Sequence, residues 1–373
     1  MKIGFDAKRL FFNGSGLGNY SRDTVRILSS LAPHNDYVLF SPSAGNAQGF
    51  AVPESMRTVI PSGAAAALGG SLWRSYGMAP AIRRSGVELY HGLSNELPAD
   101  IRRAGVRSVV TVHDLVFVTR PELYRPADRF LYTRKYGRSC RNADRIVAIS
   151  RCTADDLVRL WNVPASAIEV IYQGCSPRFG EPVEDGRIRA AMKKYALPDG
   201  YVLSVGTVEA RKNLMLVLRA MAECRLDVHL VACGRRTSYA ERLEEYARDH
   251  GLAGRLHLRH AVSFDDLPAI YRGARAFVYP SYYEGFGIPI IEALNCGVPV
   301  MTTRGGVFSE TGGDACLYVD PDDASAAADA IKTLVTDEAL RAELVSAGRR
   351  HVSRFSDRSI AEALTSLYSS LLR

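Results

Sequence analysis

Short apolar runs rich in β-branched residues alternate with longer amphipathic stretches along the whole chain, and this alternation limits the fold more than any other feature. The pattern is typical of parallel sheets covered by helices on both faces. One series of strands is predicted at 1–6, 36–41, 87–92, 108–113, 144–150 and 168–172. A second series is predicted at 201–206, 227–234, 255–260, 275–281, 298–303 and 315–320. The two series predict an α/β protein with two Rossmann-like domains facing across a cleft.

The domain boundary is predicted near 174–186, where Gly, Pro and charged residues gather. The first domain then covers 1–178 and the second covers 186–355. The last segment, 356–373, begins with Ser356 and Asp357, either of which could cap a helix, and continues with apolar residues at helical spacing. A C-terminal helix is therefore expected.

The composition is that of a globular, water-soluble chain, because 47% of its 373 residues are hydrophobic and 23% are charged. No apolar run approaches the roughly 20 residues that span a bilayer, and MKIGFDAKRL lacks the apolar stretch of a secretory signal. The seven cysteines are scattered and never spaced as metal-binding pairs. A cytoplasmic protein with buried, reduced thiols is expected.

The formal net charge of +7 is concentrated in the first half, since residues 1–185 hold 23 Lys and Arg against 17 Asp and Glu, which leaves 24 against 23 for the rest. Much of the excess comes from Arg74, Arg83, Arg84, Arg102, Arg103 and Arg107. Such a surface could attract anionic lipid headgroups or a phosphate-bearing acceptor, although a solvated basic face is the simpler explanation. Nucleic acid is not expected as a partner, because the basic residues are not interleaved with aromatic ones.

Two glutamates, Glu284 and Glu292, flank seven residues whose pattern predicts a glycine-rich turn followed by a helix. Pro289 suits the first helical position, so Glu284 is expected in the preceding loop and Glu292 in the first turn of the helix. The backbone amides of 285–291 would then face one small volume that could hold an anion beside a hydroxyl. Alternatively, Glu292 only complements the helix dipole and the glycines only form the turn.

A second strand, loop and helix, VGTVEARKN, places Arg211 and Lys212 where the helix begins. Two cations beside unpaired amides suit a diphosphate, and without an anion they would be unfavourable at a helix N-terminus. In the first half, NGSGLGNYSR places Gly14, Gly16 and Gly18 in a similar position. This run is not a dinucleotide fingerprint, since asparagine stands where the last glycine is needed, and a tight turn without a ligand is the alternative.

Several single residues could act at the same sheet edges. His113 ends an apolar strand at the carboxyl edge, where open α/β sheets bind ligands, and His91 ends another strand that could line an acceptor site. For both, a hydrogen-bonded structural histidine is the alternative. Ser150 could reach a phosphate or cap the helix that follows. Asp320 and Asp322 form an Asp-x-Asp motif, a motif that can hold a metal ion against a diphosphate. Because they lie in a proline-containing turn directly before a predicted helix, a role in capping that helix is favoured.

The segment at 281–300 resembles the motif of two glutamates separated by seven residues in retaining glycosyltransferases of the GT-B fold, specifically glycosyltransferase family 4. Other segments resemble this family in the same order: HGLSNELP, VVTVHDLVF, ADRIVAIS, VGTVEARKNL and GDACLYVDPDD. The resemblance covers nearly the whole chain. It implies a C-terminal helix that crosses back to the first domain, a nucleotide-sugar donor bound mainly to the second domain, an acceptor bound to the first, and neither metal nor cofactor.

The resemblance also implies roles for individual residues. Catalytic roles fall on His113, Arg211, Lys212 and Glu284, which would contact the transferred sugar or the diphosphate. Donor-binding roles fall on Gly16, Gly18, Gly206, Gly285, Phe286, Gly287, Ile288 and Glu292, the last of which would hold the ribose. Many relatives carry an arginine where this chain has Thr207, so Arg211 is assumed to supply that charge. Glu310 matches a position near the nucleotide.

The overall likeness is to bacterial mannosyltransferases of surface-polysaccharide assembly. The expected reaction moves mannose from GDP-mannose to a saccharide or a polyprenyl-diphosphate-linked saccharide. A UDP-sugar remains an alternative donor, because no residue spacing in the sequence identifies the base or the sugar of the donor. A hydrolysing sugar-nucleotide 2-epimerase of the same architecture is the alternative enzyme, and a sugar-binding protein with a decayed site is the non-enzymatic alternative. The enzyme is expected at the inner face of the plasma membrane if its basic half binds lipid.

Overall fold

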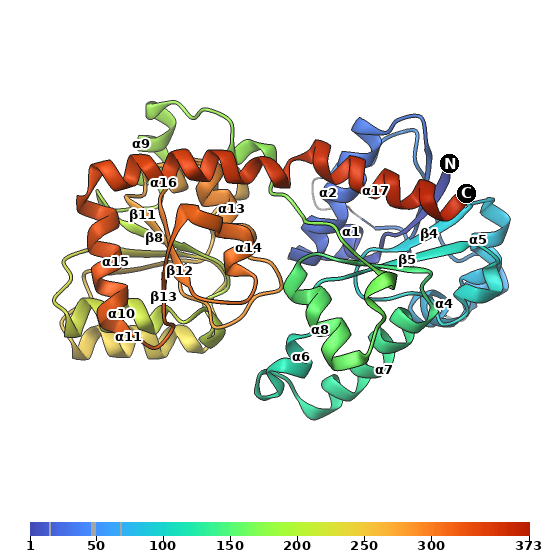
Figure 1. Ribbon diagram of the computed structural model, residues 1–373, viewed down its shortest axis with the longest axis horizontal. Helices are drawn as coiled ribbons and strands as arrows, with labels where there is room; N and C mark the ends of the chain where they lie inside the picture. The colour runs from blue at the N-terminus through green and yellow to red at the C-terminus, as the bar shows by residue number, and fades with distance from the viewer. Residues whose placement is uncertain (15, 46–49, 68) are drawn as a thin grey trace. The chain divides into compact units, whose positions relative to one another are not determined.

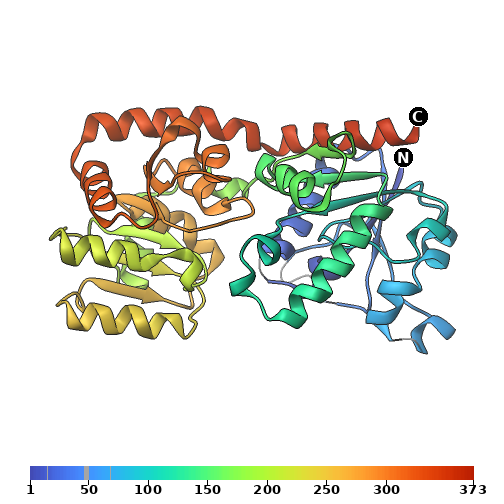
Figure 2. The same ribbon diagram turned by 60° about the horizontal axis from the view of Figure 1, so that its bottom comes forward.

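The computed structural model describes residues 1–14, 16–45, 50–67 and 69–373, which form two compact units. The first unit contains Met1–Gln173 and Phe355–Arg373, and the second contains Gly174–Arg354. Each unit is a parallel sheet with helices on both faces (Figure 1), and Figure 2 shows the same layering from a second direction. The predicted α/β fold with two Rossmann-like sheets is therefore confirmed, and the last segment of the chain returns to the first unit.

The first unit holds seven strands among the described residues, in the order β3-β2-β1-β4-β5-β6-β7, and every pairing is parallel. They are β1 (Lys2–Asp6), β2 (Asp36–Phe40), β3 (Arg57–Val59), β4 (Leu89–Gly92), β5 (Arg107–Val112), β6 (Arg145–Ala148) and β7 (Ile168–Val170). The sequence did not predict β3, because two of its three residues are exposed and it carries no apolar run. The order reverses between β1 and β4, a position where sheets of this kind bind ligands.

The second unit repeats the arrangement with six strands, in the order β10-β9-β8-β11-β12-β13. They are β8 (Val202–Val205), β9 (Leu230–Cys233), β10 (Leu256–Arg259), β11 (Ala276–Tyr279), β12 (Val300–Thr303) and β13 (Cys316–Val319). All pairings are parallel, and the order reverses between β8 and β11. The loops that follow β8 and β11 therefore leave the same edge of the sheet side by side.

Helices connect the strands in both units. Those of the first unit are α1 (Lys8–Phe12), α2 (Gly16–Leu31), α3 (Ala64–Ala67), α4 (Gly70–Tyr76), α5 (Ala79–Ser85), α6 (Val116–Thr119), α7 (Pro126–Asn142), α8 (Arg151–Trp161) and α17 (Asp357–Leu372). Those of the second are α9 (Asp185–Lys194), α10 (Leu214–Glu223), α11 (Tyr239–Asp249), α12 (Leu267–Gly273), α13 (Ile288–Asn295), α14 (Phe308–Gly312), α15 (Ala324–Thr336) and α16 (Glu338–His351).

Each unit contains a large core cluster of buried residues. In the second unit it joins the sheet to the apolar faces of α10, α11 and α15, through residues such as Val217, Leu243 and Ile331. In the first unit it joins β4 and β5 to α4, α5 and α7, with Trp73 buried at its centre. The helices therefore form because their apolar stripes are buried against the sheet, which is the main source of helix stability in proteins.

The C-terminal helix α17 is fixed to the first unit by polar contacts as well as by packing on α2. Ser356 caps it, since the hydroxyl accepts the amide hydrogen of Ser359. Arg26 on α2 donates to Asp357 at 2.7 Å. Deeper in the unit, the Tyr368 hydroxyl lies 2.7 Å from His91 Nδ1. The expected C-terminal helix is confirmed.

The segment expected as a linker, 174–186, belongs to the second unit. Phe179 is fully buried and packs edge-on against Tyr271. Arg272 donates to the backbone carbonyls of Phe179 and Glu181 at 3.2 and 2.7 Å. Composition alone does not reveal these contacts, because the arginine that makes them lies about ninety residues away in sequence.

The six arginines of the first half do not form one basic surface. Arg74 is buried, and its guanidinium pairs with Asp6 and with Glu96, the latter at 2.6 Å. Arg107 lies 3.6 Å from Asp144. Arg83, Arg84, Arg102 and Arg103 are exposed on α5 and the short 3-10 helix Ile101–Ala104, which pack together. None of these four side chains forms an ion pair within the described part of the chain.

No helix among the described residues is both long and apolar enough to cross a bilayer.

We predict that Arg74→Met lowers the free energy of unfolding by about 3–5 kcal/mol, because two buried carboxylates lose their shared cation. Burial alone would raise the pKa of Glu96, but Arg74 and Lys135 lower it to about 2. The part of this advantage that comes from Glu96 should therefore be full above about pH 4.5 and be lost as the pH falls through 2. Urea denaturation of both proteins across this range measures it.

The matched control is Arg84→Met, which removes an exposed cation from α5. Its effect should stay within about 0.5 kcal/mol. Equal losses in the two variants would contradict the role given to the buried pair.

Candidate functional site

The loop after β8 brings two cations to the carboxyl edge of the second sheet. Gly206 has a φ of +142°, which only glycine adopts readily, and its carbonyl lies against Gly234 so closely that a Cβ at 234 would come within 1.8 Å of it. A turn of 3-10 helix, Ala210–Lys212, follows, and Asn213 with a φ of +53° then starts α10. Arg211 and Lys212 therefore lie directly before the helix, as predicted.

Lys212 reaches across the sheet edge to the loop after β11. Its Nζ donates to Glu284 Oε1 at 2.6 Å and to the Tyr279 hydroxyl at 2.5 Å, and it also lies 4.5 Å from the centre of the Tyr279 ring. The aliphatic part of the lysine packs over Gly206, where an added Cβ would lie 3.4 Å from Cε. Lys212 therefore joins the loop after β8 to Glu284 in the loop after β11.

Arg211 holds the same loop from the other side. Its Nη1 lies 2.7 Å from Glu284 Oε1 and donates to the Tyr283 carbonyl at 2.7 Å, while Nη2 donates to Glu209 Oε1 at 2.8 Å. In return, the Tyr282 amide donates to the Arg211 carbonyl at 3.0 Å. Arg211 therefore fixes the backbone that carries Glu284.

The four charged groups of this cluster balance, since Glu209 and Glu284 oppose Arg211 and Lys212. Burial alone would raise the pKa of Glu284, but Lys212 and Arg211 outweigh it and lower the pKa to about 2. Burial lowers the pKa of Lys212, and Glu284 opposes that effect. Burial would also lower the pKa of Arg211, but the Glu284 charge raises it instead. Glu284 is therefore an ionised hydrogen-bond acceptor at neutral pH.

Helix α13 begins directly after this loop. Gly287 is its N-cap residue with a φ of +105°, and Ile288 is the first helical residue. Pro289 is therefore second in the helix, and the expectation that it stands first is wrong by one position. Glu292 lies beyond the first turn, which contradicts its expected place there.

The residues around α13 can be judged by how far their side chains are exposed. Phe286 is 2% exposed, so its side chain belongs to the core and only its backbone can face a ligand. Glu292 is 8% exposed and accepts a hydrogen bond from the Tyr271 hydroxyl at 2.7 Å. The donor-binding roles of Gly285, Ile288 and Glu292 stay predictions.

In the first unit, His113 lies just beyond the carboxyl end of β5 and is almost completely buried. Its Nε2 lies 2.9 Å from the Leu93 carbonyl, its amide donates to Asn95 Oδ1 at 2.8 Å, and the Tyr20 ring packs edge-on against it. Burial lowers its pKa to about 4, although the Leu93 carbonyl opposes this. His113 is therefore neutral at pH 7, with the proton on Nε2 and a lone pair on Nδ1.

The glycines of NGSGLGNYSR differ in their surroundings. A Cβ on Gly16, the first residue of α2, would meet nothing within 4 Å. A Cβ on Gly18 would come within 1.8 Å of the Asn13 carbonyl oxygen, and the Gly18 amide donates to Asn13 Oδ1 at 3.3 Å. Arg22 closes the turn by donating to the Leu10 and Asn13 carbonyls at 2.9 Å. Gly18 is thus needed for a close backbone approach within the turn.

Two weaker candidates, His91 and Ser150, have structural contacts. Both ring nitrogens of His91 are engaged, by the Tyr368 hydroxyl and by Thr111 Oγ1 at 2.8 Å, and the side chain is fully buried, which favours the structural alternative. Ser150 caps α8 by accepting the Thr153 amide hydrogen.

The Asp-x-Asp run is also accounted for locally. Asp320 accepts the amide hydrogen of Asp322, and Asp322 accepts from the Tyr282 hydroxyl at 2.9 Å. Asp323, one residue further on, is the cap of α15. No group of three potential metal ligands occurs among the described residues. Glu310 lies on α14, and its backbone carbonyl faces His351 Nε2 at 3.0 Å.

Sequence reasoning missed two residues of the charged cluster. Tyr279 reads as a core aromatic at the end of a strand, and only its hydroxyl contact with Lys212 reveals another role. Glu209 stands two residues before Arg211, and a carboxylate so close to a predicted anion-binding arginine was a usable signal.

Two family models match this chain. A family model described as "Glycosyl transferases group 1" matches residues 188–351, and one described as "Glycosyltransferase Family 4" matches residues 15–179. O-antigen chain mannosyltransferase B from Escherichia coli is 35% identical over 274 residues, which are 72% of this chain and 70% of that protein. O-antigen chain mannosyltransferase RfbU from Salmonella typhimurium is 30% identical over 225 residues, 60% of each protein.

Among solved structures, that of HepE from Anabaena in complex with UDP and glucose has a TM-score of 0.78 at 19% identity and covers 100% of both chains. The fold and the matches define a glycosyltransferase of the GT-B class. The chain belongs to glycosyltransferase family 4.

We predict that two alanine substitutions in α2 differ in their effect on stability. Gly18→Ala should lower stability by about 1–3 kcal/mol, because the methyl group overlaps the Asn13 carbonyl and the turn must shift. Gly16→Ala meets open space and should cause no loss. Thermal unfolding of the two variants measures the difference, and an equal effect would contradict the packing role of Gly18.

Proposed function

We propose that the protein is a retaining hexosyltransferase that moves mannose from GDP-mannose to a saccharide acceptor in cell-surface polysaccharide synthesis. The observation that carries the proposal is the cluster of Lys212 and Arg211 around the ionised Glu284, directly before the N-terminus of α13. It places cations, a carboxylate acceptor and a helix start within one loop cluster. A sugar joined to a diphosphate needs these three kinds of group together.

The proposed chemistry depends on charge that develops on the leaving group. As the bond from the anomeric carbon to the diphosphate breaks, the diphosphate gains negative charge, which Lys212 and Arg211 would stabilise. Glu284 would accept hydrogen bonds from hydroxyls of the transferred sugar. In the front-face route that the family favours, the departing phosphate takes the proton of the acceptor hydroxyl, which then bonds to the same face of the sugar. In the first unit, His113 Nδ1 would accept a hydrogen bond from a hydroxyl of a bound sugar.

We propose that no metal ion takes part, because the two cations provide the charge that a metal supplies elsewhere. The site residues cannot choose among donors by themselves. The mannosyltransferase relatives support mannose as the sugar. HepE was solved with UDP and glucose, which keeps a UDP-sugar as the alternative donor.

We predict that Lys212→Ala and Glu284→Gln both reduce transfer from GDP-mannose to a dimannoside by at least about a hundredfold, the usual effect of removing one transition-state contact. Their effects on GDP binding should differ. Lys212→Ala removes a cation and should weaken binding about tenfold or more, since a charged hydrogen bond is lost. Glu284→Gln turns a neutral cluster into one with a net charge of about +1, so GDP should bind at least as tightly.

Radiolabelled product formation measures transfer, and thermal shifts with GDP, UDP and ADP measure binding, because a ligand stabilises in proportion to its affinity. GDP should give the largest shift with the wild-type protein. A reaction without acceptor is the control, since release of an epimerised free sugar would favour the epimerase. Wild-type turnover in either variant would contradict the proposed site. Equal thermal shifts for all three nucleotides would contradict GDP-mannose as the donor.

We further propose a cytoplasmic enzyme that meets a polyprenyl-diphosphate-linked acceptor at the inner face of the plasma membrane. The support is the exposed set Arg83, Arg84, Arg102 and Arg103, whose charges are not neutralised by ion pairs within the described residues. Each arginine near an anionic bilayer contributes about 1 kcal/mol.

Replacing these four arginines by alanine should therefore weaken sedimentation with phosphatidylglycerol vesicles at least about tenfold and leave binding to neutral phosphatidylcholine vesicles unchanged. The control replaces four exposed arginines of the second unit, Arg225, Arg242, Arg248 and Arg350. Equal losses in both quadruple variants would show only a general effect of net charge and would contradict the proposed surface.

A further inference from the structure

The side chain of Tyr279 lies in the core of the second unit, but its hydroxyl reaches the charged cluster. Tyr279 is the last residue of β11 and is 2% exposed. Its ring stacks on Phe277 and packs edge-on against Phe308 of α14, and its carbonyl accepts a hydrogen bond from Thr302 Oγ1 at 2.8 Å. Because β11 pairs with β8 on one side and β12 on the other, the ring cannot move without disturbing the sheet.

The Tyr279 hydroxyl contacts both members of the central ion pair. It accepts an N–H of Lys212 at 2.5 Å, and it donates its own hydrogen to the Glu284 carboxylate. Burial and the Glu284 charge raise the pKa of Tyr279 well above its ordinary value, so the hydroxyl keeps this hydrogen at neutral pH. A hydroxyl can donate one hydrogen bond and still accept another, so Tyr279 serves the ammonium and the carboxylate at once.

These contacts fix the orientation of the Lys212 ammonium group. An ammonium carries three N–H donors and otherwise turns freely about its last carbon–nitrogen bond. Glu284 Oε1 takes one donor at 2.6 Å, and the Tyr279 hydroxyl takes a second. With two donors held, the direction of the third is set, and that donor has no partner among the described residues. The third N–H is therefore the one left for a ligand.

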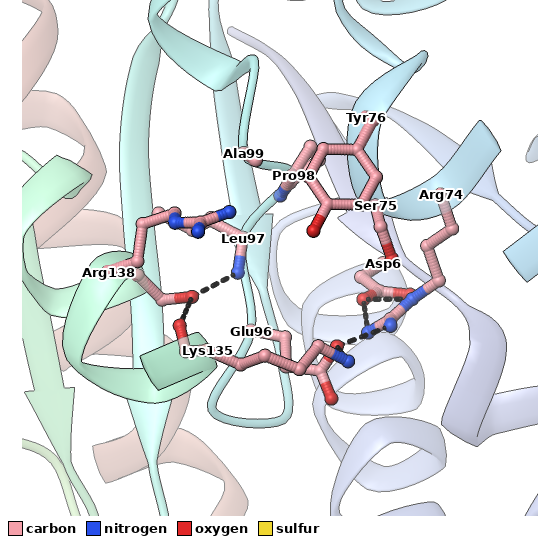
Figure 3. Close-up of a pocket in the computed structure, with 11 residues that line it drawn as sticks. Asp6, Arg74, Ser75, Tyr76, Glu96, Leu97, Pro98, Ala99, Lys135 and Arg138 are labelled. Atoms are coloured by element: carbon pink, nitrogen blue, oxygen red, sulfur yellow. Dashed lines mark hydrogen bonds and ion pairs between the residues drawn. The ribbon is translucent and has the colours of Figure 1, made fainter. Parts of the chain in front are cut away.

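The ion network of the first unit shows why burial makes the tyrosine necessary. There, Glu96 is also held by two cations, Arg74 and Lys135, which Figure 3 shows around it. The side chain of Lys135 is 37% exposed, whereas that of Lys212 is 12% exposed. Water can solvate an exposed ammonium, but a buried one depends on protein groups for its charge and its orientation.

We propose that Tyr279 is a positioning residue of the transfer reaction, whose hydroxyl holds the Lys212 ammonium charged and turned so that its third N–H meets the diphosphate of the donor. The inference rests on the proposed function, because Lys212 is the group that would stabilise the leaving group. Tyr279 acts through Lys212 and not on the donor itself. The alternative is a structural hydroxyl that is buried with its ring and has no part in the reaction.

Tyr279→Phe removes only the hydroxyl and keeps the ring. Transfer from GDP-mannose should fall at least about tenfold, and the dissociation constant of GDP should rise about fivefold or more, because a hydrogen bond to a charged group is lost. Radiolabelled product and calorimetry measure the two effects. When Lys212→Ala is already present, the same change should alter GDP binding by less than about twofold, since no ammonium is left to position.

The matched control is Tyr201→Phe. Tyr201 is fully buried directly before β8, in the same sheet, and its hydroxyl donates to the Ile270 carbonyl rather than to the cluster. Both variants lose one buried hydroxyl, so their melting temperatures should fall by similar amounts. Only Tyr279→Phe should lose transfer and GDP binding.

A pH series separates positioning from a packing defect. Burial lowers the pKa of Lys212, Arg211 lowers it further, and Glu284 and Glu209 oppose this. Tyr279→Phe removes an acceptor that favours the charged ammonium, so the Lys212 pKa should fall and the charge should be lost at a lower pH. The variant's GDP dissociation constant, divided by that of the wild type, should therefore rise between about pH 7 and pH 9. This ratio cancels the titration of GDP itself.

Wild-type transfer in Tyr279→Phe, a ratio that stays constant with pH, or equal losses with and without Lys212 would each overturn the positioning role. Equal losses of GDP binding in Tyr279→Phe and Tyr201→Phe would show a packing defect and overturn it too. UDP titrated into the same samples separates the two proposals. A wild type that binds UDP but not GDP defeats the proposed donor, and the Tyr279 test is then decided with UDP. A wild type that binds neither nucleotide defeats the diphosphate site on which both proposals depend.

Discussion

The second unit depends on one buried carboxylate. Glu284 Oε1 lies 2.6 Å from Lys212 Nζ and 2.7 Å from Arg211 Nη1, so it joins the loop after β8 to the loop after β11. These loops meet because β8 and β11 are neighbours in the sheet and parallel strands end at the same edge. A buried charge is tolerated only when its partners stay in place, so the contact fixes both loops together.

The first unit uses the same device at the corresponding place. Arg74 is held between Asp6, the last residue of β1, and Glu96, in the loop after β4, and the order of that sheet reverses between these two strands. In both units, an ion network joins the segments that meet where the strand order reverses. Sites built this way are rigid before any ligand arrives, and such preorganisation favours selective binding.

Much of the fold was readable because parallel strands buried on both faces are nearly continuous apolar runs, and helices that cover them carry apolar stripes. The exceptions have physical causes. The edge strand β3 is mostly exposed and carries no apolar run. Arg74 was read as a surface cation, because a formal charge count carries no information about burial. Tyr279 was missed, because an aromatic at a strand end looks the same whether or not its hydroxyl contacts a lysine.

By itself, the sequence determined the two strand series and the presence of a glutamate loop and a cationic loop, each before a helix, since these are local patterns of polarity and turn residues. Only the tertiary structure decided which groups pair. Lys212 and Glu284 are 72 positions apart, and Arg74 and Asp6 are 68 apart. Strand order brings them together, and strand order follows from how the helices pack on the sheet rather than from any local run of residues.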